Sequence, residues 1–132
     1  MSKAKISIGS WAYAIGPYAD HPIPLDEVIQ KLSQLGFDGI ELGGFKPHAH
    51  PDLYATKEER KKLLNMLEKA KLGVSAYVAD LWSFPFASGD PKIIKAFEEM
   101  YDRSLELCVD CGFDKIRVDT VSGTPFPKDW DY

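Results

Sequence analysis

The chain has 132 residues, of which 45% are hydrophobic and 27% charged, and its formal net charge is −4 at pH 7. This composition excludes disordered and collagen-like chains and is typical of one domain with a buried core. The mild acidity argues against a protein that binds nucleic acid through its phosphates. No stretch has the roughly 18 apolar residues of a membrane helix, and the N-terminus lacks the apolar part of a secretory signal. A cytoplasmic protein without a membrane partner is therefore expected.

Short apolar runs alternate with longer segments whose apolar residues recur at helical spacing. Strands are predicted over residues 6–10, 39–42, 74–78 and 115–119. The apolar stripes of three helices lie between them, over residues 25–35, 63–70 and 94–111. This alternation predicts an α/β fold with right-handed crossovers and a parallel sheet.

The ends of the helices carry recognisable signals. Thr56 and Glu59 have the spacing of a capping box, and Asp90 followed by proline predicts the start of the third helix. The helices are predicted to end at Gly36, Gly73 and Gly112, since glycine adopts the left-handed conformation at low cost.

These glycines reveal a repeat of one strand plus one helix. Their spacings are 37 and 39 residues (73 − 36 = 37, 112 − 73 = 39), and the segment 36–42, GFDGIEL, recurs at 112–118 as GFDKIRV. Parallel β/α barrels need about 8 such units. The chain is therefore interpreted as a partial barrel domain over 1–132, the N-terminal half of a TIM barrel with four strands and three helices, in which 120–132 is an unfinished strand-to-helix loop.

Four motifs carry a resemblance to a known family. They are ISIGSW at 6–11, LGFDGIEL at 35–42, HAHP at 48–51 and IRVD at 116–119. With these motifs the whole chain resembles the N-terminal half of the xylose isomerase-like barrels, which include sugar phosphate isomerases and epimerases and a family of apurinic endonucleases.

The resemblance implies a metal-dependent enzyme that acts on a sugar or sugar phosphate by a proton or hydride shift between adjacent carbons. It also implies a divalent ion (Mn, Mg, Co or Zn) held mainly by residues of the second half of the barrel. This chain alone is accordingly expected to be inactive.

Glu41 and Arg117 occupy equivalent positions of the repeat, five residues after Gly36 and Gly112 (41 − 36 = 5, 117 − 112 = 5). Their apolar neighbours alternate with them, which predicts that both side chains point into the barrel and form an ion pair at its mouth. Glu41 is the candidate catalytic group and Arg117 a candidate substrate-binding residue. A purely structural pair is the alternative.

Further candidates follow the strands, where the sites of α/β folds lie. Trp11, Trp82 and Phe84 are candidate aromatic walls for a sugar, and Asp80 and Asp119 are candidate partners for its hydroxyl groups. Each aromatic residue could instead pack a loop, and each aspartate could cap a turn.

His48 and His50 lie in the loop after the second strand, and apurinic endonucleases of the family place a metal-binding histidine there. They are the candidate metal ligands of this chain, and an exposed loop without a ligand role is the alternative. Cys108 and Cys111 form a C-x-x-C at the end of the third helix, where core packing in a reducing compartment is expected.

Two other functions stay open. The chain could be a non-catalytic half-barrel that pairs with itself, as a homo-oligomer, or with a separate C-terminal half through its sheet edges. An apurinic endonuclease-like activity is disfavoured, because the acidic chain has no basic stripe.

Overall fold

The structure is a computed structural model that describes residues 4–119, so the segment 120–132 and its predicted loop lie outside the described residues. Four strands and three α-helices alternate along the chain. In chain order they are β1 (Ser7–Gly9), α1 (Leu25–Gln34), β2 (Gly39–Gly43), α2 (Lys57–Ala70), β3 (Gly73–Val78), α3 (Pro91–Cys111) and β4 (Ile116–Arg117). Single 3-10 turns, η1 (Ser10–Tyr13), η2 (Gly16–Tyr18) and η3 (Phe86–Ser88), lie in the strand-to-helix segments.

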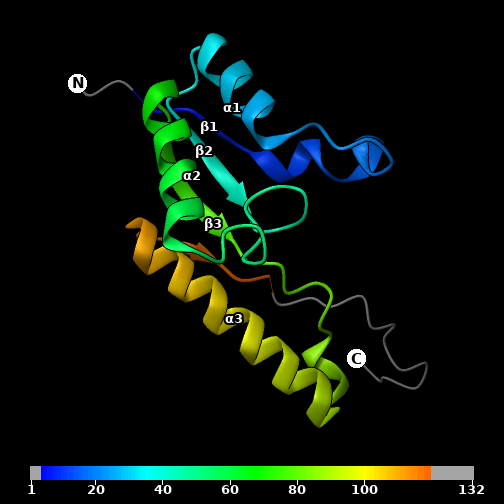
Figure 1. The fold of residues 1–132 in the computed structure, drawn as a ribbon. Coiled ribbons are helices and arrows are strands. Elements are labelled where there is room, and N and C mark those ends of the chain that lie inside the picture. The colour runs from blue at the N-terminus through cyan, green and yellow to red at the C-terminus, as the bar shows by residue number, and fades with distance from the viewer. Residues whose placement is uncertain (1–3, 120–132) are drawn as a thin grey trace.

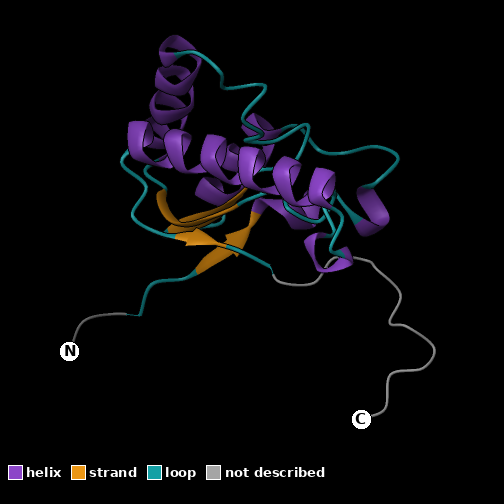
Figure 2. Cartoon of the chain, turned by 90° about the horizontal axis from the view of Figure 1, so that it is seen from below, coloured by secondary structure: helices purple, strands orange, loops and turns teal. Residues whose placement is uncertain are grey.

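The strands form one parallel sheet in the order β1-β2-β3-β4, as Figure 1 shows. The helices gather on one face of this sheet, and we call the other face the open face (Figure 2). The predicted α/β fold with a parallel (β/α) repeat, four strands and three helices is therefore confirmed, and its architecture is that of half a β/α barrel.

Local sequence explains where the helices begin. At the start of α2, Thr56 accepts a hydrogen bond from the amide of Glu59, whose carboxylate in turn accepts one from the amide of Thr56, which is a complete capping box. Asp90 caps α3 through the amide of Lys92. Helix α1 follows Pro24 and has no side-chain cap.

The helix ends differ from the prediction at one position. Gly36 and Gly112 adopt positive φ values of 80° and 69° after α1 and α3, as predicted. After α2, however, the left-handed residue is Lys71, with φ 55°, and Gly73 is the first residue of β3. The predicted stop at Gly73 was therefore wrong. Gly73 instead pairs with Gly39 of β2.

The core lies between the sheet and the helices. Ile40 and Leu42 of β2 and Tyr77 of β3 are fully buried against Leu63 of α2 and Leu107 of α3. Alternation along each strand turns the intervening residues to the open face.

Two predicted boundaries are also corrected. Leu35, placed in the buried stripe of the first helix, is 60% exposed, because it lies past the last helical turn of α1. Strand β4 covers only two of the five residues predicted for it (115–119). Helix α3 is long but carries a charged face, and no helix within residues 4–119 has the length and apolarity to cross a bilayer.

Candidate functional site

Trp11 lies against the backbone of β1 and β2 because two glycines leave room for it. A Cβ atom at Gly9 would lie 2.1 Å from Nε1 of Trp11, and one at Gly43 would lie 3.1 Å from its Cβ. No side chain at Gly9 could coexist with this indole position. The Gly-Ser-Trp sequence that ends β1 and begins η1 thus seats an aromatic ring at the carboxyl end of the sheet.

Glu41 points to the same place. Its neighbours Ile40 and Leu42 are buried on the helix side, so alternation directs the carboxylate to the open face. Oε2 of Glu41 accepts hydrogen bonds from Nε1 of Trp11, at 2.7 Å, and from Nη1 of Arg117, at 2.9 Å. Among the described residues no hydrogen bond reaches Oε1. The predicted Glu41–Arg117 ion pair is therefore present, and one carboxylate oxygen is left to accept from a ligand.

The ion pair crosses β3, which lies between β2 and β4. The register places Ala76 beside Glu41 and Val78 beside Arg117. Ala76 is small enough for the long arginine to reach over the middle strand. The guanidinium carbon of Arg117 also lies 5.6 Å from the ring centroid of Trp11, a cation–π distance.

Asp119 and Trp82 extend this arrangement. Nη2 of Arg117 donates to Oδ2 of Asp119 at 3.1 Å, and Nε1 of Trp82 reaches the same oxygen at 3.4 Å. The five residues Trp11, Glu41, Arg117, Asp119 and Trp82, here called the open-face cluster, therefore form one connected set. Phe84, by contrast, packs against the helix-side core.

The open-face cluster has two carboxylates, one guanidinium and two indoles. Because the side chain of Glu41 is 18% exposed and that of Arg117 40% exposed, these groups are open to a ligand from solvent. Fixed acceptors and donors next to aromatic rings suit a small molecule that carries several hydroxyl groups. The catalytic and substrate-binding roles of these residues stay predictions.

Asp80 lies apart from the open-face cluster in the hydrogen-bond network. Burial raises the pKa of its carboxyl. The charge of a protonated His50 and a hydrogen bond from Ser83 lower this pKa, but by less. Among the described residues no hydrogen bond or ion pair joins the half-buried Asp80 to His50, and Asp80 is a separate group from Glu41.

Neither histidine of the β2–α2 loop (residues 44–56) is exposed. His48 is fully buried, with Nε2 at 2.8 Å from the carbonyl oxygen of Ile23. His50 accepts a hydrogen bond from the amide of Asp52 through Nδ1 and has only 6% of its surface exposed. Burial lowers the pKa of both imidazoles. The exposure of these histidines that the alternative assumed is therefore wrong.

The described side chains do not assemble into a metal site. Within residues 4–119, no group of three or more His, Cys, Asp or Glu side chains is placed to hold one. Nε2 of His48 is already hydrogen-bonded to a carbonyl, and the carboxylate within 4 Å of His50 is that of Asp52, at 3.5 Å, which is itself bound by Lys46 and Arg103. The described residues thus do not fit a complete metal site, and metal binding by His48 and His50 stays a prediction.

The two cysteines are part of the core. Cys108 and Cys111 are buried as free thiols on the inner side of α3. Burial raises the pKa of Cys108 to about 12 and also raises that of Cys111. Both remain protonated near neutral pH, so the C-x-x-C spacing reflects packing.

Sequence reasoning missed the residues that fix the β2–α2 loop. Oη of Tyr77 donates to the carbonyl oxygen of Ala49 at 2.9 Å, and a Cβ at Gly44 would lie only 2.5 Å from that hydroxyl oxygen. Asp52 binds Lys46 of the loop at 2.7 Å and also Arg103 of α3. The four buried residues at 48–51 include two histidines and a proline, which do not resemble core residues, so the sequence carried no signal of their burial.

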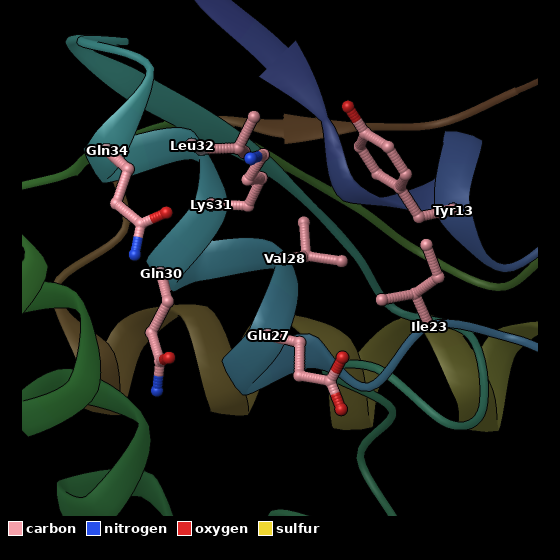
Figure 3. A pocket seen from close by; sticks show the side chains of 8 residues that line it. All are labelled: Tyr13, Ile23, Glu27, Val28, Gln30, Lys31, Leu32 and Gln34. Atoms are coloured by element: carbon pink, nitrogen blue, oxygen red, sulfur yellow. The ribbon is translucent and has the colours of Figure 1, made fainter.

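A groove of about 330 Å³ lies between α1 and the segment after β1 (Figure 3). Figure 3 shows Val28 and Leu32 of α1 on one side and Tyr13 and Ile23 on the other. None of the predicted site residues lines it. The groove is thus separate from the open-face cluster.

Comparison with known proteins adds no family assignment. No protein-family model matches the chain, and no curated protein is significantly similar to it.

Proposed function

We propose that the chain supplies the sugar-binding first half of an isomerase or epimerase barrel of the xylose isomerase-like kind. The observation that carries the proposal is the carboxylate of Glu41, held through Oε2 by Trp11 and Arg117, with no hydrogen bond to Oε1 from any residue within 4–119. The half-barrel architecture supports it, because the cluster lies at the carboxyl ends of the strands, where β/α barrels have their sites.

The ligand in this proposal is a sugar or sugar phosphate. The indole faces of Trp11 and Trp82 pack against its C–H groups, while Asp119 and Oε1 of Glu41 accept hydrogen bonds from its hydroxyls. Arg117 donates to an oxygen of the ligand or, in a sugar phosphate, to the phosphoryl group. Each of the five residues of the open-face cluster thus contacts the ligand in this proposal.

Glu41 moves the proton in the proposed reaction. Its carboxylate takes a proton from the carbon beside the carbonyl, and the electron pair of the broken C–H bond moves to the carbonyl oxygen, which gives an enediolate. A proton passes from the neighbouring hydroxyl to that oxygen, and the carboxyl of Glu41 then returns its own proton to the former carbonyl carbon, which converts aldose to ketose. Inversion of the centre instead takes a proton from water on the opposite face of the same carbon. Because the described residues do not fit a metal site, no step of this scheme passes through a metal.

Deuterium exchange in heavy water tests the proton transfer. The partial reaction needs only a base in place, so it reports on Glu41 even where full turnover requires the other half of the barrel. Aldoses, ketoses and their phosphates are incubated with the chain, alone and with each of the ions Mn²⁺, Mg²⁺, Co²⁺ and Zn²⁺, and deuterium at the carbon beside the carbonyl is measured by NMR. We expect exchange that falls roughly 100-fold or more in Glu41→Gln.

The control variant is Glu68→Gln, which changes an exposed glutamate on α2. It should exchange like the original chain. Equal exchange in Glu41→Gln and the original chain, or no exchange with any sugar, contradicts the proposal.

A second candidate is a non-catalytic half-barrel that pairs with another half, either a second copy or a separate chain. It is favoured by the helix-free open face and by the positions of β1 and β4 as the outer strands of the described sheet (Figure 2). Sedimentation equilibrium of the purified chain distinguishes the two. A dimer over the whole concentration range supports pairing, and a folded monomer opposes it.

Cytosolic location belongs to both candidates and is supported by the two free thiols.

A further inference from the structure

His48 is the most deeply buried polar residue of the β2–α2 loop. None of its surface is exposed, and its backbone amide donates to the carbonyl oxygen of Phe45 at 2.7 Å. Nε2 lies 2.8 Å from the carbonyl oxygen of Ile23. A carbonyl oxygen can only accept, so Nε2 must carry the hydrogen.

The other ring nitrogen sets the charge state. Nδ1 of His48 is buried and has no hydrogen-bond partner among the described residues. In the neutral imidazole with its hydrogen on Nε2, Nδ1 is a bare acceptor. In the imidazolium it would be a buried donor with nothing to receive it, which is more costly. The geometry therefore selects the neutral form.

The bond to Ile23 joins two segments that are distant in sequence. The amide of Ile23 donates to the carbonyl oxygen of Tyr13 at 3.0 Å, and Tyr13 is the last residue of η1, the turn that carries Trp11. On the loop side, the amide of Ala49 donates to the carbonyl oxygen of Gly43 at 2.9 Å. These three hydrogen bonds, with the backbone between His48 and Ala49, thus connect the end of β2 to the turn of Trp11.

We propose that His48 is a positioning residue, a neutral latch that fastens the segment before α1, and with it the turn of Trp11, to the β2–α2 loop. It touches no member of the open-face cluster directly, so its effect on that cluster passes through Ile23 and Tyr13. This role does not depend on which molecule the open face binds.

Within residues 4–119, the charged groups near the latch do not bind His48. Lys46, two residues before His48, binds Asp52 at 2.7 Å. Asp26 of α1 and Tyr54 of the loop line the neighbouring groove with Pro47. None of them forms a hydrogen bond or ion pair with His48 among the described residues, so the Ile23 carbonyl is the partner that fixes the ring.

The latch is tested on the whole 132-residue chain by NMR. Long-range ¹H–¹⁵N correlation of the imidazole assigns its tautomer, and amide hydrogen exchange reports local opening at Ile23 and His48. We expect the hydrogen on Nε2. We also expect exchange at both amides to rise roughly tenfold in His48→Leu, since the carbonyl of Ile23 would be left buried without its donor.

Two further variants separate a latch from simple core packing. His48→Gln keeps an N–H group near the position of Nε2 and should restore most of the protection lost in His48→Leu. His21→Gln changes an exposed histidine and should leave both amides unchanged.

The hydrogen on Nδ1 in the original chain would overturn the proposal, and so would unchanged exchange in His48→Leu. Because the tautomer is read in the original chain, the proposal remains falsifiable even where His48→Leu does not fold. A Gln variant no better protected than the Leu variant would also contradict it.

Discussion

The two faces of the sheet are built from alternate residues of the same strands, yet they differ in nearly every physical property. On the helix side, Ile40, Leu42 and Tyr77 are fully buried in one apolar core. On the open face, Glu41 and Arg117 form a partly solvated ion pair over Ala76. Apolar burial stabilises a fold far more than exposed charges do. The helix side therefore carries the stability, and the open face is free to carry binding.

The largest expected effect is on the helix side. Leu42→Ala removes a fully buried side chain and should lower the free energy of unfolding by about 3 kcal/mol. Leu35→Ala, at a position that is 60% exposed, should change it by less than about 0.5 kcal/mol. Urea unfolding followed by circular dichroism measures both. Similar losses of unfolding free energy in the two variants would contradict the difference between core and surface.

The next largest loss of stability is expected where the indole of Trp11 packs against Gly9. Gly9→Ala places a Cβ where Nε1 of Trp11 now lies, so the indole must move and its bond to Glu41 must break. We expect a loss of about 1–3 kcal/mol and a shifted indole resonance of Trp11. Gly73→Ala is the matched control, because its new Cβ would meet nothing closer than 3.6 Å. An unchanged indole resonance in Gly9→Ala would show that Trp11 does not pack against β1 at Gly9.

The free energy of unfolding should depend on pH through the histidines of the β2–α2 loop. Burial holds the pKa of His48 below its ordinary 6.5, so the unfolded chain takes up a proton that the folded chain does not. The contribution of His48 to stability is complete above pH 6.5 and is lost as the pH falls below that value.

His50 acts in the same direction, whereas Asp80, whose pKa is raised, acts in the opposite one. The informative quantity is therefore the difference in unfolding free energy between the original chain and His48→Gln, measured from pH 8 to pH 5. This difference should shift in favour of the variant as the pH falls. A constant difference would show that His48 titrates alike in both states.

The smallest stability effect is expected for the ion pair of the open face. A double-mutant cycle with Glu41→Gln and Arg117→Met should give a coupling energy below about 1 kcal/mol, since both side chains are partly solvated. A coupling of several kcal/mol would instead support the purely structural pair that the sequence left open.

The sequence was informative wherever a local rule decided the structure. The capping box at Thr56, the glycine stops at Gly36 and Gly112, and the equivalent positions of Glu41 and Arg117 were all predicted from spacing. Each depends on a few neighbouring residues or on strand alternation, which a single sequence displays.

The sequence was uninformative where long-range contacts decided. Nothing near Gly73 shows that Lys71 takes the left-handed position, or that Gly73 must face Gly39 across the sheet. The requirement for glycine at position 9 depends on where the indole of Trp11 settles, and the burial of His48 depends on a carbonyl 25 residues away. Such partners are brought together only by the folded sheet.

We propose that the open-face cluster binds a sugar through Glu41, and the indole NMR signals of Trp11 and Trp82 report such binding. Both indoles donate to carboxylates of this cluster, so a ligand there must shift their Nε1–H resonances. Titration with sugars and sugar phosphates should shift both signals in the original chain and in Glu68→Gln, and the Trp82 response should be lost in Glu41→Gln. No shift with any sugar, or an unaltered response in Glu41→Gln, would contradict the claim.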